Sequence, residues 1–171
     1  QALIRTSHVN GYQPQLLESV EEVNKKQKLV IPQKVVKRFG EDLSGKTFAI
    51  WGLSFKPDTD DMRESAAITI INELTKRGAT VNAFDPKAMN EAKRCYLKDN
   101  DSVNYVSAKY DALKDADALI LVTEWKEFRS PDMDEVRRLL KNPIVFDGRN
   151  QYEKKSMLRD GFEYYQIGVG R

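Results

Sequence analysis

The sequence has little of what disulfides, metal centres and membrane segments require. Among its 171 residues there is a single cysteine, Cys95, and a single histidine, His8. One cysteine cannot form an internal disulfide, and together with one histidine it cannot supply the ligand set of a structural zinc site. No apolar run approaches the roughly 20 residues that a membrane-spanning helix needs. We therefore expect a protein of a reducing compartment, the cytoplasm, with no metal centre and no membrane partner.

An excess of one sign of charge is also missing. The chain holds 28 basic and 26 acidic residues, so its net charge is +2, and no long block carries one sign. A nucleic-acid partner is not expected, because binding of a polyanion depends on a basic surface. A length of 171 residues is enough for one domain with its own core and an additional helical element.

From Lys46 onward, short β-rich runs alternate with helical patterns. Continuous apolar runs such as "FAIWG" and "ALILV" are typical of central strands that are buried on both faces. Strands that alternate with helices predict a parallel sheet, and we expect an α/β fold with a Rossmann-like, doubly wound sheet of about six strands. The expected strands are 47–52, 80–84, 103–106, 118–123, 144–147 and 163–167, and the expected helices are 66–77, 86–97, 111–114, 133–140 and 153–159.

The first 44 residues differ from the rest, with apolar residues at helical spacing between many charged ones. Gly11 and Pro14 are expected to separate a short helix from a longer one, which Pro32 kinks or restarts because it lacks an amide proton. A one-sided apolar stripe must be buried against something. Two interpretations stay open: a charged helix that packs on its own domain, or a linker or dimerisation helix. The apolar positions are Leu16, Val20, Val23, Val30 and Ile31.

The turn after the first expected strand lacks the glycines of a dinucleotide-binding domain. Such a domain has G-x-G-x-x-G there, which lets the backbone approach a pyrophosphate. This chain has Gly52 followed by "SFKPDTDDMRES" at 54–65, which we call the charged loop. NAD binding at this turn is therefore not expected, although Asp85 ends the second strand where a ribose-binding acid would stand. We expect Asp85 to cap or brace the turn before Pro86 instead.

The charged loop carries groups that suit a phosphorylated ligand. Lys56 and Arg63 can bind phosphate or carboxylate oxygens, and Phe55 offers a flat apolar face for a sugar or a base. The alternative is a solvated loop with internal salt bridges, which is the usual role of surface charges. The carboxylates that would orient the cations or cap local turns are Asp58, Asp60, Asp61 and Glu64.

A second candidate is "VFDGRNQY" at 145–152. Arg149 follows the fifth expected strand, so it lies on the same carboxyl edge of the sheet as the charged loop. Ligands of open parallel sheets bind at that edge, and Arg149 could therefore face Lys56 across one crevice. The alternative is a structural ion pair between Arg149 and Asp147.

"VTEWKEFR" at 122–129 ends the fourth expected strand on the same edge. Glu124 and Trp125 could line the crevice, although a tryptophan in this position is more typical of a core or an interface. His8 has no visible acid or nucleophile partner, and Cys95 has no histidine nearby to activate it. We therefore assign no catalytic residue in this chain.

Four motifs of the sequence point to one particular protein family. "GLSFKPDTDDMRES", "AFDPKA", "ADALILVTEWKEFR" and "VFDGRNQY" occur in an order and at a spacing that closely resemble the UDP-glucose 6-dehydrogenase family, within the wider UDP-glucose and GDP-mannose dehydrogenases. The chain from Lys46 onward resembles the C-terminal half of that family, and "QALIRTSHVNGYQPQLLESVEEVNKKQK" looks like its central helical connection. The resemblance implies a connection or dimerisation segment at 1–44 and a C-terminal UDP-sugar-binding domain at 45–171.

The resemblance also implies a reaction. The family oxidises the C6 alcohol of a nucleotide sugar to a carboxylate in successive NAD-dependent steps, through a thioester on a cysteine of a G-G-x-C-x-P-K-D-T motif. That motif is absent from this chain, and Cys95 stands in no matching motif. NAD would be held mainly by a separate N-terminal domain. The chain is therefore expected to be inactive alone, to work with that domain, and to form a homodimer through its N-terminal helices.

Position by position, the resemblance implies that Phe55, Lys56 and Arg149 contact the UDP-sugar. It also implies that Arg63 reaches toward the NAD. The motifs "FKPDTDDMRES" and "DGRN" favour UDP-glucose as the substrate. A UDP-N-acetyl sugar or GDP-mannose is the alternative substrate, and a non-catalytic nucleotide-binding module is the alternative of another class.

Overall fold

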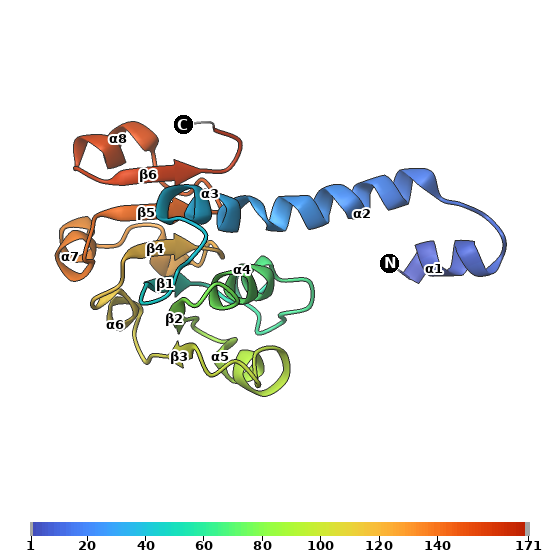
Figure 1. Cartoon of the computed structure of the whole chain (residues 1–171), viewed down its shortest axis with the longest axis horizontal. Coiled ribbons are helices and arrows are strands. Elements are labelled where there is room, and N and C mark those ends of the chain that lie inside the picture. The colour runs from blue at the N-terminus through green and yellow to red at the C-terminus, as the bar shows by residue number, and fades with distance from the viewer. Residues whose placement is uncertain (1, 170–171) are drawn as a thin grey trace.

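The computed structural model describes residues 2–169. Their centre is a six-stranded sheet in the order β3-β2-β1-β4-β5-β6, in which every neighbouring pair is parallel. Helices cover both faces of the sheet (Figure 1), which confirms the predicted Rossmann-like, doubly wound α/β fold. The strands are β1 (Thr47–Trp51), β2 (Thr80–Phe84), β3 (Val103–Tyr105), β4 (Ala118–Leu121), β5 (Ile144–Asp147) and β6 (Glu163–Gln166).

The apolar runs of β1 and β4 explain why these strands lie at the centre, because such strands must be covered on both faces. Phe48 and Ile50 point to one face and pack against α3 and α4. Ala49 and Trp51 point to the other face and pack against α6, α7 and α8. The helices are α3 (Val30–Phe39), α4 (Ala66–Thr75), α6 (Lys109–Leu113), α7 (Met133–Leu139) and α8 (Lys154–Arg159).

The expected helix at 86–97 is shorter and less regular than predicted. α5 (Met89–Glu91) is followed at once by a π-helical turn, η1 (Ala92–Tyr96). The Asp85 carboxylate accepts hydrogen bonds from the amides of Lys87 (2.9 Å) and Ala88 (2.8 Å), which holds these residues in a turn. The prediction of a helix from residue 86 is therefore wrong. The other expected strands and helices of the sheet domain are present, with ends that differ by at most two residues.

The N-terminal helices form a hairpin that projects from the sheet (Figure 1). α1 (Ala2–Val9) turns back beside α2 (Gln15–Lys28), and α2 has no buried residue. The chain restarts as α3, with Pro32 in the first turn, where a missing amide costs no helical hydrogen bond. This confirms the expected restart at Pro32. Unlike α2, α3 contributes Ile31 and Val35 to the core.

At 14 residues, α2 is the longest helix among residues 2–169. None of the described helices is long and apolar enough to cross a membrane. The division of the chain into 1–44 and 45–171 stays a prediction. Three residues of these two segments, Gln1, Gly170 and Arg171, lie outside the described residues.

Candidate ligand-binding site

A groove opens at the carboxyl edge of the sheet. The strand order reverses between β1 and β4, and open parallel sheets bind ligands outside this switch point. The groove has a volume of about 640 Å³, which is ample for a small organic ligand. Its apolar lining comes from α3, α4, the charged loop and the segments after β4 and β6, through Ile31, Ile70, Phe55, Val122 and Ile167.

Helix α2 forms a polar wall of this groove, which the sequence reasoning missed. Glu21, Asn24, Lys25 and Lys28 line the groove, and their i, i+3, i+4, i+7 spacing places them on one helix face. Lys28 Nζ donates to Oε2 of Glu64 at 2.6 Å, which ties α2 to the charged loop. The same spacing is visible in the sequence and is the signal that could have indicated this wall.

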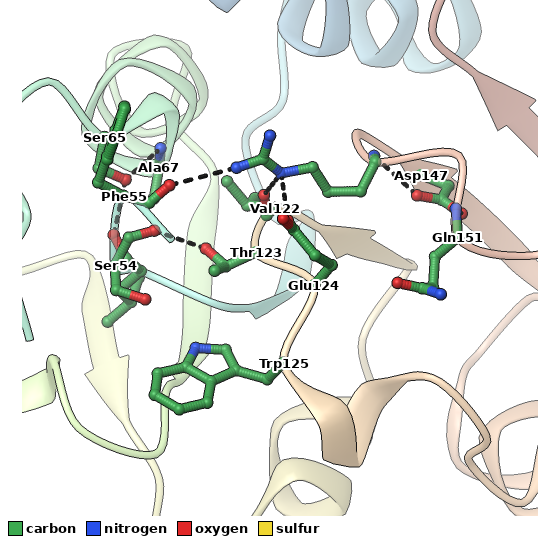
Figure 2. A network of polar contacts seen from close by, with 12 residues as sticks. Ser54, Phe55, Ser65, Ala67, Val122, Thr123, Glu124, Trp125, Asp147 and Gln151 are labelled. Atoms are coloured by element: carbon green, nitrogen blue, oxygen red, sulfur yellow. Dashed lines mark hydrogen bonds and ion pairs between the residues drawn. The ribbon is translucent and has the colours of Figure 1, made fainter. Parts of the chain in front are cut away.

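Arg149 bridges the loops on either side of β4. Its Nε donates to the carbonyl of Val122 at 2.9 Å, and its Nη2 donates to the carbonyl of Phe55 at 3.2 Å (Figure 2). Nε also lies 2.7 Å from Oε2 of Glu124 in an ion pair. The alternative ion pair with Asp147 is wrong, because Asp147 accepts from the backbone amide of Arg149 while the guanidinium turns to Glu124.

Asp147 shapes the loop that carries Arg149. This carboxylate is fully buried, and its Oδ1 accepts the amide of Arg149 at 2.8 Å. Its Oδ2 accepts the amides of Gln151 (2.7 Å) and Tyr152 (3.1 Å) and the hydroxyl of Tyr164 (2.6 Å). Burial, helped by the neighbouring carboxylate, raises the pKa of the Tyr164 hydroxyl, so this hydroxyl stays a donor. The loop is therefore held in one conformation around Arg149.

Asp85 braces the turn after β2, as predicted. It is fully buried, and its Oδ2 accepts the amide of Leu53 at 2.7 Å and the indole Nε1–H of Trp125 at 3.1 Å. Trp125 is itself buried, which confirms its assignment to the core. A carboxylate enclosed in this way is not accessible to a ribose, so Asp85 stabilises the loops rather than binding a ligand.

Gly52 serves the packing of the segment after β4. Its φ is +94°, and a Cβ at this position would lie 2.5 Å from Cβ of Thr123. Thr123 Oγ1 in turn donates to the carbonyl of Ser54 at 2.6 Å. A dinucleotide needs the space beside this glycine for its pyrophosphate, and here Thr123 fills it. The turn after β1 therefore does not fit NAD.

Of the residues predicted to bind a ligand, Phe55 and Arg149 come together in the groove. Phe55 is 49% exposed, which is unusual for a phenylalanine and leaves its ring open to a ligand. Lys56 and Arg63 do not line the groove. Within residues 2–169 Lys56 is exposed and makes no hydrogen bond or ion pair, so it does not face Arg149 across the groove.

The side chain of Arg63 is 80% exposed and pairs with Asp61, whose Oδ2 lies 2.8 Å from Nη2. The Arg63 guanidinium, by donating to that carboxylate, lowers the pKa of Asp61 to about 2. Internal pairing was the alternative interpretation of the charged loop, and it holds for this pair. The loop backbone is also constrained, since Asp58 (φ +66°) and Glu64 (φ +61°) adopt conformations that are rare for such residues.

The remaining chemically active residues lie away from the groove. His8 has an acid partner, contrary to expectation, because the helical hairpin brings its Nε2 within 2.7 Å of Oε1 of Glu18. Cys95 is exposed in the π-helical turn η1. Within residues 2–169 no group of histidine, cysteine, aspartate and glutamate side chains is arranged to hold a metal ion.

Comparison with known proteins agrees with this geometry. Residues 49–154 match the model of the UDP-binding domain of the UDP-glucose/GDP-mannose dehydrogenase family. The chain is 40% identical over 178 aligned positions to a UDP-glucose 6-dehydrogenase of Pseudomonas aeruginosa, covering 99% of this chain and 38% of the relative. It is 36% identical over 167 positions to a UDP-glucose 6-dehydrogenase of Rhizobium meliloti, covering 98% of this chain and 37% of the relative. The chain thus spans little more than a third of the length of these relatives.

Solved structures show the same similarity. A UDP-glucose dehydrogenase from the archaeon Pyrobaculum islandicum superposes with a TM-score of 0.77 at 31% identity, over 96% of this chain and 34% of that one. A GDP-mannose dehydrogenase from Pseudomonas aeruginosa gives a TM-score of 0.67 at 20% identity, over 97% of this chain and 37% of that one. The second match supports the fold alone.

Proposed function

Because the chain belongs to the UDP-glucose/GDP-mannose dehydrogenase family, we propose that it supplies the UDP-sugar-binding part of an NAD-dependent UDP-glucose 6-dehydrogenase. The observation that carries this proposal is the groove at the switch point of the sheet, where Phe55 and Arg149 meet. A groove that combines apolar side chains with the guanidinium of Arg149 suits a ligand with a ring and a negatively charged diphosphate.

The ligand contacts follow from the chemistry of these side chains. The exposed ring of Phe55 packs against the base or the sugar, and the guanidinium of Arg149 binds oxygens of the diphosphate or sugar. Lys56 lies next to Phe55 in the charged loop, and its side chain is exposed. Because Lys56 lies outside the groove, its ammonium group contacts the part of the ligand that extends beyond Phe55.

The oxidation itself requires groups that this chain does not hold. We propose that the thioester cysteine and the main NAD site lie on a further domain of a longer protein, since the chain covers 37% to 38% of two curated relatives. In this proposal Arg63, whose side chain is 80% exposed, contacts the cofactor on that domain. The chain alone is therefore inactive in UDP-glucose oxidation.

The helical hairpin supplies the subunit contact in this proposal. Leu16 (77%), Val20 (51%) and Val23 (62%) are exposed along one side of α2, while the polar stripe of the same helix faces the groove. An apolar stripe of this kind needs a cover, and a second copy of the chain in a homodimer provides one.

Calorimetric titration of UDP-glucose into the chain tests the proposal. Saturable binding is expected, and Phe55→Ala and Arg149→Gln should each weaken it at least about fivefold, the effect of roughly 1 kcal/mol. Leu158→Ala and Arg129→Gln are matched controls, because both side chains are exposed and neither lines the groove. Equal affinity in all variants would remove Phe55 and Arg149 from the site.

Titration of UDP-N-acetylglucosamine and GDP-mannose in parallel tests the choice of substrate. UDP-glucose is expected to bind most tightly. Tighter binding of either alternative would assign the chain to another branch of the family. Binding of UDP-glucose by a full-length protein that has no dehydrogenase activity would favour a non-catalytic nucleotide-binding module.

A further inference from the structure

Residues 122–125, which follow β4, contact the loops after β1, β2 and β5. Thr123 donates to the carbonyl of Ser54 in the charged loop, and Trp125 donates to Asp85 after β2. Val122 accepts from the guanidinium of Arg149 after β5. Figure 2 shows this segment running between Ser54 and Phe55 on one side and Asp147 on the other. The segment therefore sets how the groove-forming loops lie relative to one another.

Glu124 is the charged residue of this segment. Its Oε2 is shielded from solvent and has no hydrogen-bond partner within the described residues. The group that compensates this oxygen is the guanidinium of Arg149, whose Nε lies 2.7 Å away. A shielded carboxylate oxygen without such a charge is costly, so the position of Glu124 and the position of Arg149 depend on each other.

From this geometry we propose that Glu124 is a positioning residue, which holds the guanidinium of Arg149 in the orientation that binds a UDP-sugar in the groove. The identity of the ligand rests on the proposed function, whereas the contact between Glu124 and Arg149 does not. Glu124 acts through Arg149 and does not itself touch the ligand.

The partners of the individual guanidinium nitrogens support this role. Nε faces Val122 and Glu124, and Nη2 faces Phe55, whereas Nη1 has no partner within residues 2–169. The edge of the guanidinium that carries Nη1 is thus left for a ligand. The carbonyls of Val122 and Phe55 accept the hydrogen bonds of the guanidinium but are neutral, so the charge that compensates it comes from Glu124.

The contact is tested without ligand by the Nε–Hε resonance of Arg149 in proton–nitrogen NMR spectra. The resonance is assigned by its loss in Arg149→Lys. Glu124→Gln, which keeps the size but removes the charge, should shift this resonance and speed its exchange with water about tenfold, because loss of the ion pair lets the side chain leave the carbonyl of Val122 more often. Glu124→Asp, which keeps the charge but draws it back, should do so to a smaller extent. An unchanged resonance in both variants would overturn the proposal.

The functional role is tested by titrating UDP-glucose into the same variants. Glu124→Gln should weaken binding about fivefold, and it should have no further effect in an Arg149→Gln background. Glu127→Gln, an exposed glutamate three positions along, should change neither the resonance nor the affinity.

Two results of this titration would overturn the positioning role. Tighter binding in Glu124→Gln would mean that Glu124 acts only as a negative charge near an anionic ligand. Unchanged binding with a lower unfolding midpoint would mean that its role is structural alone. Absence of binding in the unmodified chain would contradict the proposed function instead, and the NMR experiment would still decide the contact.

Discussion

Replacement of Asp147 by asparagine probes how the loop that carries Arg149 is held. The carboxylate is fully buried and accepts hydrogen bonds from the amides of Arg149, Gln151 and Tyr152 and from the hydroxyl of Tyr164. In asparagine one of the two oxygens becomes an NH₂ group. If that group replaces Oδ1 it faces the Arg149 amide, and if it replaces Oδ2 it faces three donors.

At least one buried donor therefore loses its acceptor in Asp147→Asn, which costs about 1–3 kcal/mol, and the remaining bonds lose their charge assistance. We expect the free energy of unfolding to fall by about 3 kcal/mol in total. An NH₂ group in place of Oδ1 faces one donor rather than three, so this orientation is the favoured one. It releases the backbone of Arg149, and the affinity for UDP-glucose should therefore fall as well.

Urea denaturation followed by circular dichroism measures this change as a lower midpoint at an unchanged slope. Asp101→Asn is the matched control, since Asp101 is exposed and lies at the other side of the sheet, before β3. A loss below about 0.5 kcal/mol, the size of an ordinary surface substitution, would refute the reasoning.

Three further outcomes follow from the described contacts. Gly52→Ala places a Cβ 2.5 Å from that of Thr123 and should cost more than about 3 kcal/mol in urea denaturation. Gly11→Ala, where a Cβ meets nothing within 4 Å, should cost only about 1 kcal/mol, and equal losses would contradict the packing argument. Ser65→Ala removes the cap of α4, which accepts the amide of Ala67 at 3.2 Å, and should lower the unfolding midpoint by the equivalent of about 1 kcal/mol. The lowered pKa of Asp61, about 2, means that its stabilising contribution is complete above its unfolded pKa and is lost as the pH falls toward 2. The difference in urea midpoint between the unmodified chain and Asp61→Asn should therefore shrink from pH 5 to pH 2, and a constant difference would exclude this linkage.

The strands and helices of the sheet domain were predictable from the sequence because they follow from local signals. Continuous apolar runs predict central strands, and Gly78 (φ +89°) and Ser65 mark the ends of the helix between β1 and β2. The role of Asp85 was predictable for the same reason, since an aspartate before Pro86 accepts nearby amides. The same interaction explains why α5 starts later than predicted. The Asp85 carboxylate binds the amides of Lys87 and Ala88, and this turn replaces the first helical turn.

The site was only partly predictable, because side-chain pairing across loops depends on the fold. Arg149 was placed correctly at the carboxyl edge, but its partner is Glu124 rather than Asp147. Whether an arginine meets one or the other of two nearby carboxylates depends on where each strand ends relative to its neighbours. The sequence does not give these relative positions. The wall formed by α2 does not follow from the apolar stripe of that helix, because it is the polar stripe that faces the groove.

The central claim is that the groove at the carboxyl edge binds a UDP-sugar, and NMR titration of the chain with UDP-glucose tests it most directly. Amide resonances that shift on binding should belong to residues around Phe55, Val122 and Arg149 and to the polar face of α2. Resonances at the opposite edge, around Asp117 and Lys141, should not move. Shifts confined to that opposite edge, or no shifts at millimolar UDP-glucose, would contradict the account.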